Sequence, residues 1–161
     1  MAWIRCCGGS AIEPTPTALV PKMTANNAPY GIAFASSEYG ANYQAWKAFN
    51  QSTTDTPWES TLADRNSWVG YQFVVPTVVK SCEYTINCDR PCTIVVQGSN
   101  DNTIWEDVST VYSVPGTGVV SGILSMATNK KRYGSYRLLF NSTGTAVIPN
   151  AVREMQFYGY Q

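Results

Sequence analysis

The sequence of 161 residues predicts a single all-β domain, a sandwich or jelly roll of antiparallel strands. Three observations support this prediction. Charged residues make up only 14% of the chain while tyrosine, serine, threonine and asparagine are frequent, which suits strands and polar loops better than amphipathic helices. Short runs alternate between apolar and polar residues. Glycine, proline and asparagine separate these runs at nearly regular spacing.

Residues 1–22 differ from the rest and are expected to form an extended N-terminal arm or linker, followed by one domain over residues 23–161. Prolines and threonines over residues 14–17 favour extended backbone. Trp3 and Ile4 are apolar residues that an isolated tail would expose to water, so we expect this arm to dock onto another subunit or protein. No apolar stretch near the start is long enough for a Sec signal peptide.

The clearest strand is 68–75, in which Val69, Tyr71, Phe73 and Val75 lie on one face before Pro76 ends the run. One short helical turn is expected at 44–50, because Ala45, Ala48 and Phe49 recur at helical spacing. The further strands expected, each bounded by turn residues, are 78–87, 92–97, 104–112, 118–126, 136–140 and 155–160.

Charge and the missing histidine argue against several classes of function. The chain has 11 basic and 11 acidic residues, so it lacks the positive footprint that nucleic-acid binding needs, and no nucleic-acid partner is expected. It has no histidine, the commonest general base and metal ligand. Triad chemistry is therefore not expected, and Glu38, Glu59 and Asp64 leave a carboxylate acid/base pair as a distant alternative. No apolar stretch approaches the roughly 20 residues that cross a bilayer.

Five cysteines are an odd number, so at least one thiol is free or paired with another chain. A bridge between Cys88 and Cys92 is geometrically conceivable across a strand–turn–strand. Zinc is not favoured because the C-x2-C spacing does not occur twice. The favoured interpretation is a set of small buried or partly exposed thiols.

Six segments in a particular order carry a resemblance to a known family. They are Ala35–Tyr39, Ala48–Asn50, Thr56–Ser60, Trp68–Phe73, Gln97–Asp101 with Trp105, and Tyr136–Leu138 with Glu154–Gly159. Together they resemble the discoidin (coagulation factor V/VIII C-type) domains and family 32 carbohydrate-binding modules over about residues 24 to 160. The resemblance implies an eight-stranded antiparallel jelly-roll β-sandwich of the galactose-binding-like type, with ligand loops at one end. It also places Trp58, Trp68 and Trp105 beneath the loops or inside the sandwich.

The resemblance further implies a structural calcium ion in the loop after the helical turn. Where the family usually has an Asp-Gly pair, this chain has Asn50-Gln51, and the loss of a carboxylate weakens a calcium site. A metal-free loop held by hydrogen bonds is the alternative. The expected calcium ligands are Asn50, Ser52, Asp55, Thr56 and Glu154.

Loop side chains are the candidates for sugar recognition, which needs planar hydrogen-bonding groups and an aromatic face. The expected ligand-binding residues are Glu38, Tyr39, Tyr43, Asp64, Arg65, Asn87, Asp89 and Arg90, and Asn141 and Asn150 bracket a further turn. These residues and the resemblance predict a non-catalytic carbohydrate-binding adhesion module for cell-surface glycans. Its weak sites would gain avidity in a homo-oligomer or larger particle assembled through residues 1–22.

The absence of a Sec signal together with an adhesive domain is similar to phage tail or virion decoration proteins, so a virion or extracellular location is expected. The alternative is a purely structural virion or assembly protein that has the same jelly roll and no sugar site. Membrane insertion is not expected, because the loops lack an exposed pair of apolar residues at their tips.

Overall fold

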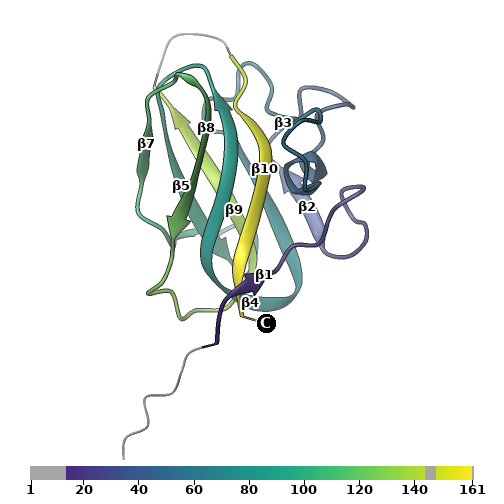
Figure 1. Ribbon diagram of the computed structural model, residues 1–161, viewed down its shortest axis with the longest axis vertical. Coiled ribbons are helices and arrows are strands. Elements are labelled where there is room, and N and C mark those ends of the chain that lie inside the picture. Colours follow the sequence, from purple (N-terminus) through teal and green to yellow (C-terminus); the bar gives the residue numbers. More distant parts are fainter. Residues whose placement is uncertain (1–13, 144–147, 161) are drawn as a thin grey trace, which may run out of the picture.

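The computed structural model describes residues 14–143 and 148–160 and shows an all-β fold of antiparallel strands (Figure 1). This confirms the predicted fold class. In chain order the elements are β1 Thr17–Ala18, β2 Ile32–Ala35, the 3-10 helix η1 Ala45–Phe49, β3 Trp58–Glu59, β4 Trp68–Cys88, β5 Cys92–Ser99, β6 Glu106–Asp107, β7 Tyr112–Val114, β8 Gly118–Ser125, β9 Tyr133–Ser142 and β10 Ala151–Tyr160. Within the described residues, no helix has the length and apolar character needed to cross a membrane.

The long strand β4 belongs to both layers of the sandwich. Its first part, up to Thr77, pairs with β2 and β9, and its second part pairs with β10 and β8. One layer, which we call the β9 sheet, therefore has the order β2-β4-β9-β5, with β6 and β7 on the free edge of β5. The other layer, the β10 sheet, has β1 and β3 on one edge of β10, then β4 and β8.

The bend in β4 corrects two details of the sequence prediction. Pro76 was expected to end the strand, but β4 continues through it to Cys88. A proline is tolerated here because the pairing between β4 and β9 is interrupted between Gln72 and Thr77. Pro76 therefore does not have to donate a backbone hydrogen bond to a neighbouring strand. Val75 was expected on the inner face and is instead 66% exposed, because the bend breaks the two-residue alternation.

The strand expected over 104–112 is also wrong. Only β6 in this segment pairs with β5, and β7 begins at Tyr112. The hydroxyl of Ser109 instead accepts the backbone N–H of Val96 at 2.9 Å, so a side chain takes the place of a strand partner.

The core lies between the two sheets and is rich in aromatic rings. Tyr71 from β4 packs against Phe49 of η1, with ring centroids 5.6 Å apart, and Tyr136 from β9 packs against Phe157 from β10 at 5.7 Å. Trp58 is fully buried, as expected. Each such side chain contributes about 1.5–3 kcal/mol by leaving water. The helical turn predicted at 44–50 is confirmed by η1, whose inner residues are Ala45, Ala48 and Phe49.

Part of the expected N-terminal arm belongs to the sandwich. Thr17 pairs with Gly159 of β10, and Leu19 and Val20 are buried. The Gln156 side chain binds both the N–H and the C=O of Val20, each at 3.0 Å. The sandwich therefore begins before the expected boundary between residues 22 and 23. The docking segment expected around Trp3 and Ile4 lies outside the described residues.

Trp68 and Trp105 do not enter the core. They lie half-buried on the outer face of the β9 sheet, where the Arg137 guanidinium is 5.0 Å from the Trp68 ring centroid and 4.0 Å from that of Trp105. The rings of Phe34 and Trp68 meet edge to face, with their centroids 5.4 Å apart. Neighbouring residues of a strand face opposite sides, so an inward Val69 requires an outward Trp68.

Candidate functional site

The loops at the upper end of the sandwich in Figure 1 form a continuous rim, which we define as residues 36–44, 59–67, 87–91 and 141–143 with Asn150. Backbone hydrogen bonds link these loops. The N–H of Tyr39 donates to the carbonyl of Glu59 at 2.8 Å, and that of Ser142 donates to the carbonyl of Arg65 at 3.1 Å. Thr143 donates to the carbonyl of Pro91 at 3.4 Å. The rim therefore collects most of the residues that the sequence nominated for ligand binding.

Asp64 is the most firmly held carboxylate of the rim. Its Oδ2 accepts hydrogen bonds from the hydroxyls of Ser36 at 2.6 Å and Ser37 at 2.8 Å. These hydroxyls in turn accept the backbone N–H groups of Trp68 and Thr61, both at 3.1 Å. Among the described residues Oδ1 of Asp64 has no hydrogen-bonding partner, so the loops fix the carboxylate while leaving one oxygen for a ligand.

Tyr39 and Tyr43 form an aromatic pair on the loop whose Ser36 and Ser37 hold this carboxylate. Their rings meet edge to face with centroids 5.5 Å apart, and Tyr39 is 50% exposed. The carboxylate of Glu38 is already hydrogen-bonded within the protein. Its Oε1 accepts the first N–H of η1, from Ala45, at 2.8 Å and the side-chain amide of Asn26 at 3.5 Å. Tyr39 thus offers a ring to a ligand, whereas Glu38 holds the loop in place.

Of the ligand-binding residues predicted in and near the turn after β4, only some are exposed. Asp89 and Arg65 are exposed, and the Asn87 side-chain amide donates to Asp89 at 3.5 Å. Arg90, expected to contact ligand, is only 3% exposed. The segment around Gly116 packs closely on the Arg90 backbone, where an added Cβ would lie 2.3 Å from the Arg90 carbonyl carbon. Burial lowers the pKa of the Arg90 guanidinium.

Asn150 is also a structural residue, although the sequence placed it beside a ligand turn. It is 1% exposed, and its side-chain amide donates to the Ser67 hydroxyl at 2.7 Å and accepts from the Ser142 hydroxyl at 3.0 Å. Its backbone N–H donates to the Ser60 hydroxyl at 3.0 Å. Sequence reasoning missed this buried network, because isolated serines carry no pattern that separates buried from exposed. Asn141, by contrast, is exposed.

Four of the five predicted calcium ligands come together in the loop after η1. The backbone N–H of Ser52 donates to Oδ1 of Asn50 at 2.9 Å and to Oε2 of Glu154 at 3.1 Å. The amide of Asn50 donates to Asp55 at 3.5 Å, and the Ser52 hydroxyl accepts the N–H of Asp55 at 3.2 Å. Thr56 is exposed and takes no part in these hydrogen bonds.

This arrangement fits a metal-free loop better than a calcium site. Calcium takes about six to eight oxygens, but the oxygens of Asn50 and Glu154 converge on one N–H group. Nowhere in the described ranges do three acidic or cysteine side chains gather as a metal site would require. Gln51 has φ 56°, a left-handed conformation that suits the glycine of the Asp-Gly pair. Burial raises the pKa of Glu154 to about 7, although backbone N–H groups oppose the shift.

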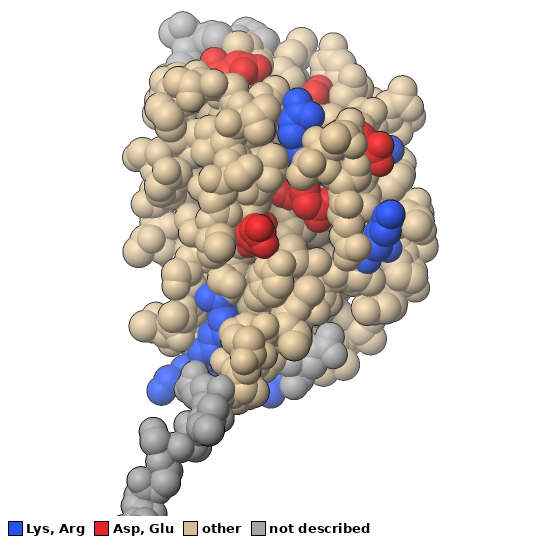
Figure 2. Space-filling view, viewed as in Figure 1, with Lys and Arg blue, Asp and Glu red and all other residues tan. Residues whose placement is uncertain are grey.

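A shallow groove beside this loop runs over the outer face of the β10 sheet. Figure 2 shows acidic side chains near the middle of this face, and Glu83 and Glu154 both line the groove. The hydroxyl of Tyr158 donates to Glu83 at 3.0 Å. None of the ligand-binding residues predicted for the rim lines this groove.

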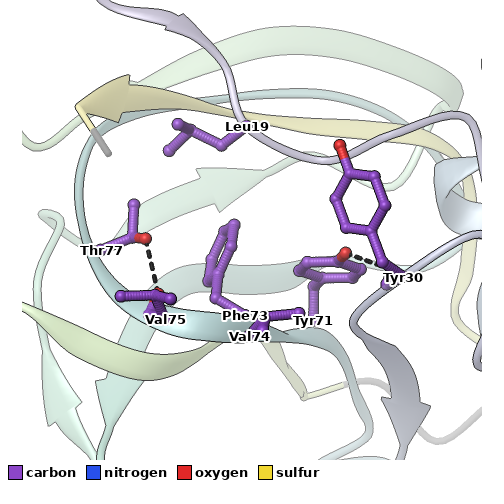
Figure 3. Close-up of a pocket in the computed structure, with 7 residues that line it drawn as sticks. All are labelled: Leu19, Tyr30, Tyr71, Phe73, Val74, Val75 and Thr77. Atoms are coloured by element: carbon purple, nitrogen blue, oxygen red, sulfur yellow. Dashed lines mark hydrogen bonds between the residues drawn. The ribbon is translucent and has the colours of Figure 1, made fainter.

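A second hollow lies at the end of the sandwich opposite to the rim. This apolar pocket of about 340 Å³ is lined by Leu19, Tyr30, Tyr71, Phe73, Val74, Val75 and Thr77 (Figure 3). The hydroxyl of Tyr71 donates to the carbonyl of Tyr30 at 2.6 Å. The sequence gives no sign of this pocket, because the segment of Leu19 has the pattern of an arm and Val75 that of a core residue.

Comparisons with known proteins agree with the fold. No protein-family model matches the sequence, and no curated protein matches it. The structure is similar to chitosan-binding module 1 from a chitosanase/glucanase of Paenibacillus sp. IK-5, with TM-score 0.65, 22% identity, and coverage of 84% of this chain and 99% of that chain.

Two further solved structures are similar. The family 32 carbohydrate-binding module of C. perfringens NanJ in complex with galactose has TM-score 0.61 and 13% identity, covering 80% of this chain and 93% of that chain. The F5/8 type C domain of a Bacteroides fragilis protein has TM-score 0.63 and 16% identity, covering 91% of this chain and 97% of that chain. At these identities the likeness establishes the fold, and the neighbours are family 32 and F5/8 type C domains, as the sequence resemblance implied.

Proposed function

We propose that this domain binds carbohydrate at the rim and catalyses no reaction. The proposal rests mainly on one observation, the exposed ring of Tyr39 on the loop that also anchors the Asp64 carboxylate. A sugar ring presents C–H groups that pack on an aromatic face and hydroxyls that hydrogen-bond to a fixed carboxylate. The similar solved structures include a chitosan-binding module and a module in complex with galactose, which supports this class of ligand.

Arg65 and Asp89 extend the proposed site along the rim. Both are exposed, so neither needs a change of the fold to meet a ligand. Arg90 and Asn150 are left out because they are buried, and Glu38 is left out because its carboxylate accepts the N–H of Ala45. The proposed contact set is therefore smaller than the predicted one.

Calorimetric titration with galactose and with a chitosan oligosaccharide tests the proposal. Tyr39→Ala should weaken binding about 2- to 10-fold, the value of one aromatic contact. Asp64→Asn should weaken it about 10-fold or more, because hydrogen bonds to a charged group contribute roughly twice as much as neutral ones.

Tyr30→Ala is the matched control for Tyr39→Ala. Tyr30 is 53% exposed and Tyr39 is 50% exposed, but Tyr30 lines the apolar pocket at the other end of the molecule. Its replacement should leave sugar affinity unchanged. If no sugar binds, or if Tyr30→Ala and Tyr39→Ala weaken binding equally, the rim is not the site.

A second candidate function is contact with protein through the end opposite to the rim. Val74 and Val75 are 74% and 66% exposed beside the apolar pocket, and clustered exposed apolar side chains favour protein contacts. Light scattering of the full chain and of a Val74→Ser variant tests this function. Membership of a phage tail or virion and an extracellular location stay predictions from the sequence alone, which neither the fold nor the comparisons support.

A further inference from the structure

Two thiols lie side by side beneath the rim. Cys88 ends β4 and Cys92 begins β5, and their Sγ atoms are 2.8 Å apart. Both side chains are buried, with 1% and 3% exposed. A disulfide bond is about 2.05 Å long, so less than about 1 Å of movement separates this contact from a covalent bond.

The backbone holds the two cysteines in this position from both sides. Cys88 pairs with Gly118 in the β10 sheet, whereas Cys92 pairs with Val114 and Ser142 in the β9 sheet. The turn between them thus crosses from one layer of the sandwich to the other. Because ladders fix both ends of the turn, the close approach of the sulfur atoms is a property of the fold.

The chemistry of the pair is asymmetric. The Cys88 thiol is within hydrogen-bonding distance of the Arg90 carbonyl, at 2.9 Å, and of Cys92. When Cys88 loses its proton, Cys92 can donate to the thiolate, which lowers the pKa of Cys88 and raises that of Cys92. One sulfur therefore serves as the nucleophile and the other as the resolving thiol.

A surface hollow reaches one member of the pair, Cys92, whose Sγ is 2.8 Å from that of Cys88. A surface pocket of about 400 Å³ is lined by Pro91, Cys92, Thr93, Ser113, Val114, Pro115 and Thr143. Cys82, the third described cysteine, is fully buried and lines none of the pockets described above.

We propose that Cys88 and Cys92 form an oxidation site that hydrogen peroxide converts to an intramolecular disulfide. The Cys88 thiolate attacks one peroxide oxygen, the O–O bond breaks, and hydroxide leaves with the electron pair, giving a sulfenic acid. Cys92 sulfur then attacks the Cys88 sulfur, the S–O bond breaks, and water leaves. In sum, two thiols are oxidised while one peroxide is reduced to two waters.

The disulfide should stabilise the fold, because it shortens the turn available to the unfolded chain. A loop of about five residues corresponds to a modest entropic gain, and we expect a rise in Tm of about 4–8 °C for a domain of this size. The bond would also join the two sheets at the rim.

Peptide mass mapping of the full chain tests the proposal. The folded protein is treated with hydrogen peroxide, quenched with catalase, denatured, and its remaining thiols are alkylated. We expect a peptide in which Cys88 and Cys92 are linked and two hydrogen masses are missing, together with the rise in Tm. Cys6→Ser and Cys7→Ser are introduced throughout, so that these two thiols cannot contribute.

Two variants serve as controls. Cys92→Ala should lose both the linked peptide and the Tm shift, whereas Cys82→Ala should keep both. Recovery of Cys88 and Cys92 in alkylated form after oxidation would overturn the proposal, and so would Cys88 ending as a sulfinic acid. Sugar binding is no part of the readout, so the outcome is independent of the proposed function.

Discussion

Removing one buried hydroxyl at the bend of β4 should destabilise the whole sandwich. Tyr136 is fully buried, and its hydroxyl donates to the carbonyl of Thr77 at 2.8 Å and accepts the N–H of Val79 at 3.2 Å. These two backbone groups lie where β4 leaves the β9 sheet and enters the β10 sheet. Tyr136→Phe keeps the ring and leaves both groups buried without that partner.

The expected cost follows from the contacts. A buried polar group that loses its partner costs about 1–3 kcal/mol. Some relaxation is expected, because Asn129 already donates to the carbonyl of Val79 at 3.1 Å and can shift. We therefore expect Tyr136→Phe to lower the free energy of unfolding by about 2–3 kcal/mol, and Tm by roughly 5–10 °C.

Urea unfolding followed by circular dichroism measures this change, with the m-value as a check that the unfolded states match. Tyr133→Phe is the matched control on the same strand. The Tyr133 hydroxyl interacts with the exposed Glu106, so its loss should cost below about 1 kcal/mol. If the two variants lose equal stability, the hydroxyl of Tyr136 does not hold the bend.

Three further predictions follow from the rim and the loop after η1. Asn150→Ala should lower the free energy of unfolding by about 2–3 kcal/mol in a denaturant titration, because the hydroxyls of Ser67 and Ser142 lose a buried partner. The pKa of Glu154 is raised to about 7 in the fold from an ordinary 4.5, so its contribution to stability is present at low pH and is lost as the pH rises to about 7. Glu154→Gln should accordingly reduce the loss of stability between about pH 5 and about pH 8 by about 1–2 kcal/mol, a value discounted for partial exposure; unchanged pH profiles would contradict the burial of its charge. Millimolar calcium should leave Tm unchanged, because the Ser52 N–H already satisfies the loop oxygens; a calcium-dependent rise that EDTA reverses would show that the loop rearranges around the ion.

The sequence predicted the architecture because local patterns determine most of it. Alternation at Val69, Tyr71 and Phe73 identified the inner face of β4, and all three are buried. The short helix was visible for the same reason. The bend in β4 was not visible. A proline that ends a strand and a proline at a bend within a strand can have the same local sequence.

The rim was harder to predict than the strands. Most of the polar loop residues that the sequence nominated lie in the rim, but burial separates Arg90 from Arg65 and Asn150 from Asn141. That separation depends on contacts between loops far apart in the chain. The Asp64 cluster shows the same limit, since Ser36 and Asp64 approach only when β2 and β4 pair.

The pairing of β1 with the end of β10 has a mechanical consequence. Thr17 and Ala18 lie against Gly159 and Tyr158, at the end of the molecule opposite to the rim (Figure 1). A force applied through residues 14 and 160 would break the two-residue pairing of β1 with β10 before it loaded the long ladder between β10 and β4. Tension between these two ends would thus strain this end of the molecule first, while Tyr39 and Asp64 kept their geometry.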